Sequence, residues 1–356
     1  MNPIDRIPFR ATLPDAFSAV PASPFAADDS PAALAHLFGA EADRNETILY
    51  TDHATIRLVG IFPNGSAEAY FGFWETANDG PLNHRAFALL EADVRQRGRQ
   101  RVVGPLNFST FYPYRLRLNN PSWGRFDREP ANPAYYPDLL EQTGYQITSR
   151  FQSRLVRNES IPIAYGQKKQ LLTALAQMPF DIIPLNPDTW QQHEADLFEL
   201  VHQVFSANPA YRAISQAQFS LLYNRHFAEK LCPYSSVLFR DRPSGKLVAL
   251  SFCQPDYQSL TFAPGDGPNF VRDFPRLAKK VLLVKSVGVH PGFRQRGLMS
   301  FLGAYGMVHF RELYDDVIFC LMRSDNFSLH FSDTLPHETA HYALFGKEIP
   351  EASVSK

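Results

Sequence analysis

The sequence predicts an α/β protein with two domains in tandem. Its 356 residues are enough for two domains, since a domain usually takes roughly 100–200 residues. In both halves, short apolar and β-branched runs alternate with longer stretches of helical periodicity, in the order strand, helix, strand. Hydrophobic residues make up 45% of the chain, so each half can bury a core of its own.

The first half opens on an arm and continues as a meander of strands. Residues 1–45 are rich in Ala and Pro, and the acidic residues and serine before Pro31 predict a short helix at Pro31–Phe38. Apolar runs on both sides of the turn Pro63–Gly65 predict two strands within Thr47–Thr76. The elements expected next are a helix at Leu82–Gly98, a strand at Arg101–Phe108, an aromatic loop, a helix at Tyr135–Gln142 and a strand at residues 147–156.

The second half repeats the alternation after a polar boundary. Polar residues and a proline at 158–166 place the two domains at residues 1–165 and 166–356. The second domain begins with a strand at Asp181–Leu185 and an amphipathic helix at Trp190–Phe205. The elements expected after these are a helical region at Asn208–Leu231, two strands around Arg242–Gly245, a strand at Val281–Val289, a helix at Leu298–Leu313, and strands at Asp316–Met322 and Thr339–Phe345.

The turn after the strand Val281–Val289 is the principal candidate for a binding site. A strand that leads through a glycine-containing turn into a helix leaves several backbone N–H groups unpaired and pointing one way. The helix dipole adds partial positive charge at the same place. The segment around Gly297 therefore predicts a site for a phosphate group.

The residues of this turn resemble motif A of the GCN5-related N-acetyltransferases (GNAT). The chain has Val-x-Pro-x-Phe-Arg-x-Arg-Gly-Leu at residues 289–298, and the family motif is Arg/Gln-x-x-Gly-x-Gly/Ala. The resemblance implies a mixed sheet flanked by helices, turn amides that hold the pyrophosphate of acetyl-CoA or another acyl-CoA, and a strand that binds pantetheine and the acyl carbonyl. Met299 stands where the family has Gly or Ala. The cofactor-binding residues that the resemblance implies are Val287, Val289, Arg294, Gln295, Arg296, Gly297, Leu298, Met299 and Asn326.

The first half resembles a degenerate copy of the same domain. Its residues 75–81 are Glu-Thr-Ala-Asn-Asp-Gly-Pro, which are acidic where a phosphate needs amides and cations. The half is also similar to a group of bacterial proteins with Gly-Phe-Phe/Trp-Glu, here at residues 72–75, and Gly-Pro-x-Asn-x-Ser, here at 104–109. We therefore expect a tandem GNAT-like protein whose first domain helps to build the acceptor pocket and whose second domain binds the thioester.

The function that follows is N-acyl transfer, from an acyl-CoA thioester and first of all acetyl-CoA, to the amine of a small molecule. Two alternatives stay open. Because Met299 crowds a pyrophosphate turn, the donor could be the phosphopantetheine thioester of an acyl carrier protein. Asp333 stands where many relatives have a Tyr acid, and Leu283 stands at the usual base position, so a domain that binds acyl-CoA without catalysis is the other alternative.

Three hydroxyl or imidazole groups are the catalytic candidates: Ser286, His330 and Ser332. Thioester aminolysis needs donors for the carbonyl oxygen, a group that takes the amine proton and an acid for the thiolate. Ser286 lies on the strand expected to hold the acyl group, where regular alternation lets only one of Lys285 and Ser286 face the cleft. His330 and Ser332 follow the next strand.

A His-Glu-x-x-His match at residues 337–341 raises the possibility of a zinc hydrolase, because on a helix this spacing puts two imidazoles on one face. Residues 339–345 alternate like a strand, which separates the two side chains. The three cysteines, Cys232, Cys253 and Cys320, have no paired spacing. We therefore expect no metal and reduced core thiols.

The net charge and the length of the apolar runs limit the classes of partner that the sequence predicts. A formal net charge of -1 argues against nucleic acid and anionic membrane as bulk partners. Neither a signal peptide nor an apolar run long enough to span a membrane is found, so we expect a cytoplasmic protein. The sequence leaves open the acceptor, the acyl chain, the acid and base, and the oligomeric state.

Overall fold

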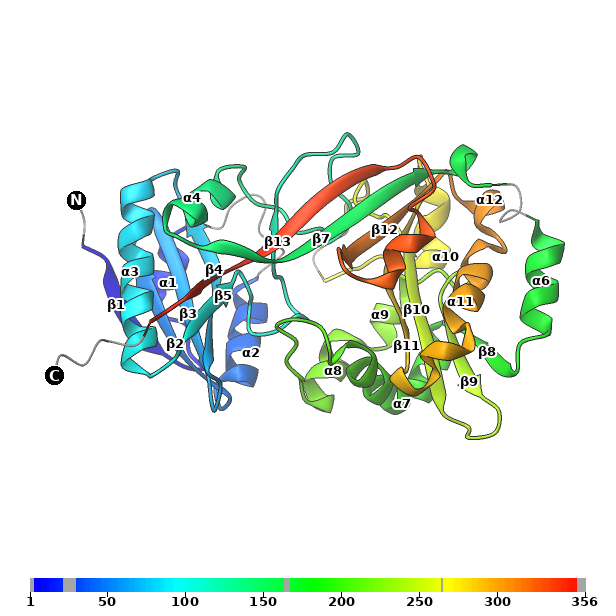
Figure 1. The fold of residues 1–356 in the computed structure, drawn as a ribbon, viewed down its shortest axis with the longest axis horizontal. Helices are drawn as coiled ribbons and strands as arrows, with labels where there is room; N and C mark the ends of the chain where they lie inside the picture. The colour runs from blue at the N-terminus through cyan, green and yellow to red at the C-terminus, as the bar shows by residue number, and fades with distance from the viewer. Residues whose placement is uncertain (1–2, 22–29, 163–166, 264, 351–356) are drawn as a thin grey trace. The chain divides into compact units, whose positions relative to one another are not determined.

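The computed structural model describes residues 3–21, 30–162, 167–263 and 265–350. The chain forms two compact units (Figure 1). The first unit contains Met1–Asn120, Arg128–Phe151 and His341–Lys356, and the second contains Pro121–Asp127 and Gln152–Ala340. The division passes through a strand, between Phe151 and Gln152. The boundary expected between residues 165 and 166 lies outside the described residues.

The sheet of the first unit starts as the expected meander. β1 through β4 are neighbours in chain order and pair antiparallel, and β5 then joins β4 in parallel. The elements are β1 (Asp5–Phe9), α1 (Asp15–Ala19), α2 (Pro31–Glu41), β2 (Asn45–Thr51), β3 (Ile56–Pro63), β4 (Glu68–Thr76), α3 (Gly80–Gln96), β5 (Arg101–Gly104), β6 (Leu116–Arg117) and α4 (Tyr136–Gln142). Two further strands, β7 (Gln146–Arg157) and β13 (Glu338–Glu348), contribute residues to both units.

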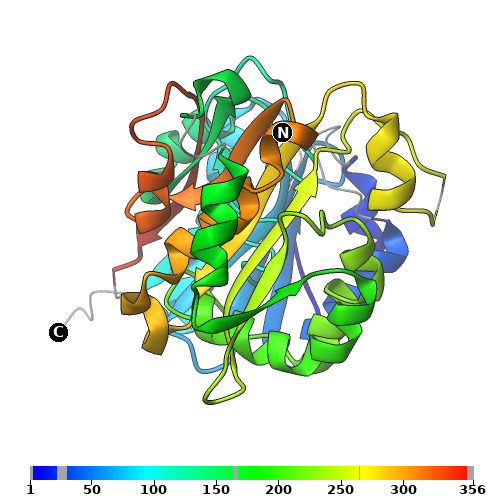
Figure 2. The same ribbon diagram turned by 90° about the vertical axis from the view of Figure 1, so that its right-hand side faces the viewer.

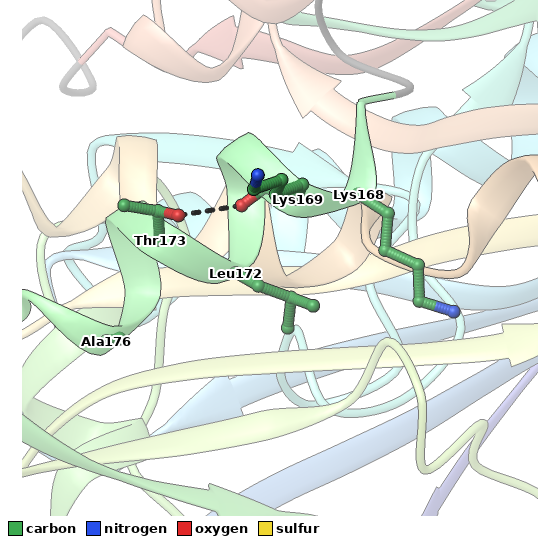
Figure 3. Close-up of a pocket in the computed structure, with 5 residues that line it drawn as sticks. All are labelled: Lys168, Lys169, Leu172, Thr173 and Ala176. Carbon is green, nitrogen blue, oxygen red and sulfur yellow. Dashed lines mark hydrogen bonds between the residues drawn. The ribbon is translucent and has the colours of Figure 1, made fainter.

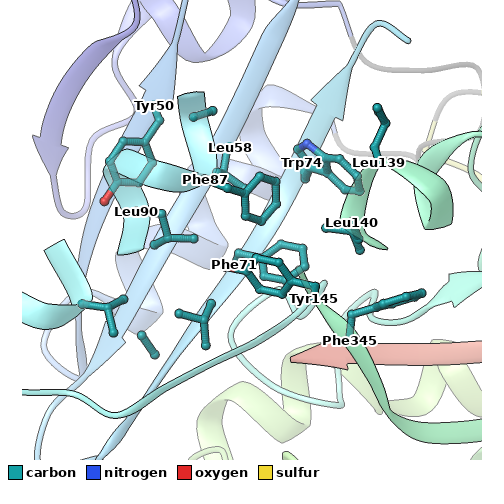
Figure 4. Close-up of a cluster of buried hydrophobic side chains, with 14 of the residues drawn as sticks. Tyr50, Leu58, Phe71, Trp74, Phe87, Leu90, Leu139, Leu140, Tyr145 and Phe345 are labelled. Carbon is teal, nitrogen blue, oxygen red and sulfur yellow. The ribbon is translucent and has the colours of Figure 1, made fainter. Parts of the chain in front are cut away.

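Aromatic side chains fill the core of the first unit. Phe71 and Phe87 lie edge to face with ring centroids 5.1 Å apart, and both contact Tyr145 (Figure 4). Phe87 comes from α3 and Phe71 from β4. The apolar stripe predicted for the helix at Leu82–Gly98 is thus the face that packs on the sheet.

The second unit is also built from a sheet and the helices that pack on it. Its sheet order is β12-β11-β10-β9-β8, and helices cover both faces (Figure 2). The elements are α6 (Lys168–Ala176), β8 (Phe180–Pro184), α7 (Pro187–Phe205), α8 (Gln216–Leu222), α9 (Arg225–Glu229), β9 (Val237–Asp241), β10 (Leu247–Pro255), α10 (Phe270–Asp273), β11 (Val281–Val289), α11 (Leu298–Met307), α12 (Phe310–Leu313) and β12 (Asp316–Arg323), with 3₁₀ helices η1 (Asn158–Ser160), η2 (Phe274–Arg276), η3 (Pro291–Arg296) and η4 (Phe327–Phe331).

Each unit contains a strand, a helix and a second strand parallel to the first, namely β4-α3-β5 and β11-α11-β12. Antiparallel neighbours complete both sheets, so the predicted α/β class with mixed sheets is confirmed. Two expected helices are each divided. The helix at Leu298–Leu313 ends at Met307 and resumes at Phe310. In the region Asn208–Leu231, Asn224 caps a new helix, because its side chain accepts the N–H of Phe227.

Candidate functional site

The turn between β11 and α11 has the geometry of an anion site. Gly297 adopts φ +71°, and a Cβ added there would meet nothing within 4 Å. α11 starts directly afterwards with no side-chain cap, and Ser300 N–H turns back to Gly297 O at 3.1 Å. The N–H groups of Leu298 and Met299 in the first turn of α11 are therefore available as hydrogen-bond donors, because the start of a helix supplies no intrahelical acceptor for them.

The side chains of this turn leave its amides open. Leu298 is fully buried, and Met299 packs in part against the same hydrophobic cluster between α11 and the sheet. Gln295 is exposed. Arg294 reaches back to two carbonyl oxygens, those of Val289 at 3.4 Å and Val204 at 3.5 Å. Arg296 Nη1 lies 3.6 Å from Asp241 Oδ1, so it adds a cation that is already partly neutralised.

β11 separates from β12 just before this turn. The parallel register pairs Val281–Val284 with Asp316–Phe319 and extends no further, although β11 continues to Val289 and β12 to Arg323. Beyond Val284 the backbone groups of β11 that face β12 are outside this parallel ladder. Such groups need other partners, and an amide-containing arm inserted between the strands would supply them.

A β-bulge changes which side chains of β11 share a face. Val284 pairs with Cys253 and Ser286 with the adjacent Phe252, so Lys285 is an extra residue. Leu282 and Val284 pack on the α12 side before the bulge, whereas Val287 and Val289 pack under α11 after it. Lys285 and Ser286 therefore both project from the opposite face. The expectation that only one of them can face the cleft assumed regular alternation, which the bulge interrupts at Lys285.

Lys285 is held by a segment far away in the sequence. Its ammonium donates to the backbone oxygen of Asp127 at 2.6 Å and lies 4.7 Å from the centre of the Phe126 ring. Phe126 packs on Leu283, which is fully buried. Leu283, which stands where the family resemblance implies a catalytic base, is thus a core side chain. The Asp127 carboxylate accepts a hydrogen bond from Gln254 Nε2 at 2.7 Å, so residues that are far apart in the sequence form this polar cluster.

Asp256 completes that cluster. Its Oδ1 accepts the N–H of Asp127 at 2.9 Å. Burial raises the pKa of the Asp256 carboxyl. The hydrogen bonds from the backbone of Asp127 and Gln258 lower it, but they offset only part of the effect of burial. The sequence does not predict this cluster, because Asp127 precedes β11 by more than a hundred residues and no local spacing links them.

The chain leaving β12 forms η4, which carries the other predicted site residues. Asn326 occupies the N-cap position of η4, is exposed and makes no side-chain capping bond. His330 is exposed, and its Nδ1 lies 2.8 Å from Asp333 Oδ2. Ser332 is fully buried, and its hydroxyl accepts Arg154 Nη1 at 3.2 Å. Of the three catalytic candidates, His330 and Ser286 have solvent access and Ser332 has none.

The corresponding turn of the first unit is closed by the chain's own groups. Asp79 caps α3 by accepting Leu82 N–H at 2.9 Å, so a carboxylate already occupies the helix start. Asn107 Oδ1 accepts Phe73 N–H at 2.8 Å. A Cβ on Gly72 would lie 2.6 Å from the oxygen of Leu106, so the strands leave no space for an inserted arm.

Neither the His-Glu-x-x-His match nor the surface pocket belongs to the Gly297 turn. Residues 338–348 form β13, as the strand prediction required, and His337 Nδ1 is within 2.8 Å of the Leu335 oxygen. In the described residues no group of three or more His, Cys, Asp or Glu is arranged to hold a metal ion. The pocket in Figure 3 lies along one helix, α6, between Lys168 and Ala176, and includes no residue of the Gly297 turn.

Comparison with solved structures shows which fold this chain shares. No family model matches the sequence, and a search of curated proteins finds no match. Among solved structures, a conserved protein of unknown function from Enterococcus faecalis V583, named a probable N-acyltransferase, aligns over 98% of this chain and 72% of its own, with a TM-score of 0.53 and 10% identity. The chain has a tandem GNAT-like fold.

Two further solved structures align with this chain at lower TM-scores. A tandem GNAT protein from the clavulanic acid biosynthesis pathway aligns over 99% of this chain and 100% of its own, with a TM-score of 0.48 and 10% identity. A GCN5-related N-acetyltransferase from Sphaerobacter thermophilus aligns over 90% and 84%, with a TM-score of 0.43 and 15% identity. In the described residues, none of the helices is both long and apolar enough to cross a membrane.

Proposed function

We propose that this tandem GNAT-like protein is an N-acyltransferase whose second unit binds an acyl-CoA, with acetyl-CoA as the first candidate, and passes the acyl group to the amine of a small molecule. The observation that carries the proposal is the contrast between two helix starts. That of α11 follows the open, left-handed Gly297 and has no side-chain cap, whereas that of α3 is occupied by Asp79.

The residues present fit a phosphorylated pantetheine thioester. The amides of Leu298 and Met299 would hold the phosphates, with Arg294 and Gln295 exposed beside them. The edge of β11 beyond Val284 would offer backbone groups to the pantetheine amides. Bound CoA would supply an activated acyl carbonyl, which makes attack by an amine a matter of positioning and proton transfer.

Ser286 carries a hydroxyl directly after the bulge residue Lys285 of β11, on the face opposite α11. In this position it would donate a hydrogen bond to a reacting group or hold the water that takes the amine proton. The buried Leu283 does neither. The chain would therefore act mainly by orienting the acyl donor through β11 and the Gly297 turn, and Ser286 would add modest acid-base assistance.

Thermal unfolding with CoA, acetyl-CoA, a longer acyl-CoA, a phosphopantetheinylated carrier protein and zinc tests the proposal, followed by thiol release over a panel of amines. We expect stabilisation by acyl-CoA and amine-dependent release of free thiol. Stabilisation by CoA with no thiol release from any amine would favour non-catalytic binding. Stabilisation by the carrier protein alone would change the donor, and stabilisation by zinc alone would reject the proposal.

A further inference from the structure

One residue of β12 has a left-handed backbone. Leu321 adopts φ +54° in the second half of this strand, and a residue with a branched side chain adopts such a φ only at a cost in free energy. Leu321 lies two residues after Phe319, the last residue of β12 in the parallel register with β11. The strained position therefore coincides with the place where that register ends.

The hydroxyl of Ser153 holds this conformation. Its Oγ accepts the N–H of Leu321 at 2.9 Å, and Ser153 is fully buried. Ser153 belongs to β7, which neighbours β12 on the side away from β11. The bond therefore draws β12 toward β7 and away from β11.

The next residue of β7 holds the segment that follows β12. Arg154 is buried, and its Nη1 donates to Leu329 O at 3.1 Å and to Asp333 Oδ1 at 2.6 Å. Leu329 belongs to η4, and Asp333 follows that 3₁₀ helix. Two successive residues of β7 thus direct the chain from the second half of β12 to the end of η4.

The first unit uses the same kind of bond with the opposite effect. Phe73 of β4 has φ +47°, and its N–H is accepted by the buried side chain of Asn107 at 2.8 Å. Asn107 follows β5, the parallel neighbour of β4, so the bond joins the two parallel strands. In the second unit the acceptor comes from the outer neighbour, and β11 continues beyond its register with β12.

We infer that Ser153 is a positioning residue for the donor site, because its bond to Leu321 keeps β12 away from the edge of β11 beyond Val284. The use of that edge by an acyl-CoA rests on the proposed function. Without the bond, Leu321 would relax to an extended backbone, and β12 would continue its register along β11. Backbone groups that are to receive the pantetheine arm would then be paired within the sheet.

Hydrogen exchange of the ligand-free protein tests the geometry. We expect Ser153→Ala to slow the exchange of β11 amides beyond Val284 by about 10-fold, because β12 then pairs with them. The Tm should fall by about 5 °C at the same time, since a buried N–H loses its acceptor. A purely structural role would speed up exchange along the whole strand, so unchanged or faster exchange of these amides overturns the inference.

Ser153→Cys provides a milder form of the same change. It keeps a side chain of similar size but offers a weaker acceptor. We expect the same local slowing of exchange at a smaller size, with a smaller fall in Tm. This variant decides the question if the alanine variant is too unstable to measure.

Calorimetric titration with CoA tests the consequence for binding. We expect Ser153→Ala to weaken CoA binding by about 10-fold. Adding Leu321→Gly to that variant should restore most of the affinity, because glycine adopts a positive φ without a bond to hold it. The double variant also loses the packing of Leu321 on the cluster around Leu283, so gains in stability would not explain the recovery. An affinity that stays low overturns the inference.

The matched control is Asn107→Ala. It removes the same kind of bond, to the left-handed Phe73, but in the unit without an open helix start. We expect a similar fall in Tm and wild-type affinity for CoA, and equal weakening of CoA binding in both variants overturns the inference. A wild-type protein that does not bind CoA rejects the proposed function, and the exchange of the β11 amides then decides by itself whether Ser153 holds the strands apart.

Discussion

The ammonium group of Lys285 donates a 2.6 Å hydrogen bond to the backbone oxygen of Asp127, a residue 158 positions earlier in the chain. Lys285 is the extra residue of the bulge in β11, so the bond ties the irregular part of this strand to the segment Pro121–Asp127. Through Phe126 the same segment also packs on Leu283. One strand thus carries an edge that extends beyond its parallel ladder and a side-chain face that is anchored by Asp127 and Phe126.

Replacing Lys285 by Met should weaken this anchor while keeping most of the apolar stem. We expect a loss of about 1 kcal/mol in the free energy of unfolding, because one hydrogen bond from a charged group is removed at a partly exposed position. Urea unfolding followed by tryptophan fluorescence measures the loss. Lys246→Met, at an exposed turn position, is the control, and an equal loss in both variants would show that the bond to Asp127 contributes nothing specific.

The open turn at Gly297 could be predicted from the sequence because everything that forms it is local. A β-branched run, a glycine and an apolar helix start follow one another within about twenty residues. The anchoring of Lys285 by Asp127 and the link from His330 through Asp333 to Arg154 could not, because each joins segments that are distant in the chain. The bulge was also missed, since one extra residue leaves the apolar pattern of β11 almost unchanged.

Gly297→Ala should separate binding from folding. A Cβ at Gly297 meets no protein atom, but φ +71° disfavours alanine, so we expect a loss of about 1 kcal/mol in stability. A methyl group among the turn amides should in addition weaken CoA binding at least about 10-fold, or about 1.4 kcal/mol, as measured by isothermal titration calorimetry.

Gly245→Ala is the matched control for this experiment. Gly245 has φ +68° and equally open surroundings, but it lies in the turn between β9 and β10. We expect the same loss of stability with CoA affinity unchanged. Equal CoA affinity in both variants would argue against phosphate binding at Gly297.

Asp79→Ala should affect folding of the first unit without creating a second donor site. The carboxylate caps α3 through Leu82 N–H, and losing such a cap costs about 1 kcal/mol. The closed contacts at Gly72 and Asn107 remain, so calorimetry should give one CoA per chain in both wild type and variant. A stoichiometry of two in the variant would mean that Asp79 alone blocks the first unit.

Asp93 should make the stability of the first unit depend on acid pH. Its buried carboxylate accepts Arg6 through two bonds of 2.6 Å, and Tyr50 and Arg97 at 2.8 and 2.9 Å. Burial raises the pKa of Asp93, but these hydrogen bonds outweigh it and hold the pKa below its usual range. Since the folded-state pKa is the lower one, the stabilisation is complete above the unfolded value of roughly 3.9 and is lost as pH falls through the folded-state value.

We therefore expect Asp93→Asn to lower the free energy of unfolding by about 2–4 kcal/mol at neutral pH, because three donors lose their charged acceptor. The difference between wild type and variant should shrink once the pH falls below roughly 4. Urea unfolding at a series of pH values measures this, with the exposed Asp138→Asn as control. A difference that stays constant down to acid pH would mean that the carboxylate's charge is not what holds β1 to α3 through Arg6.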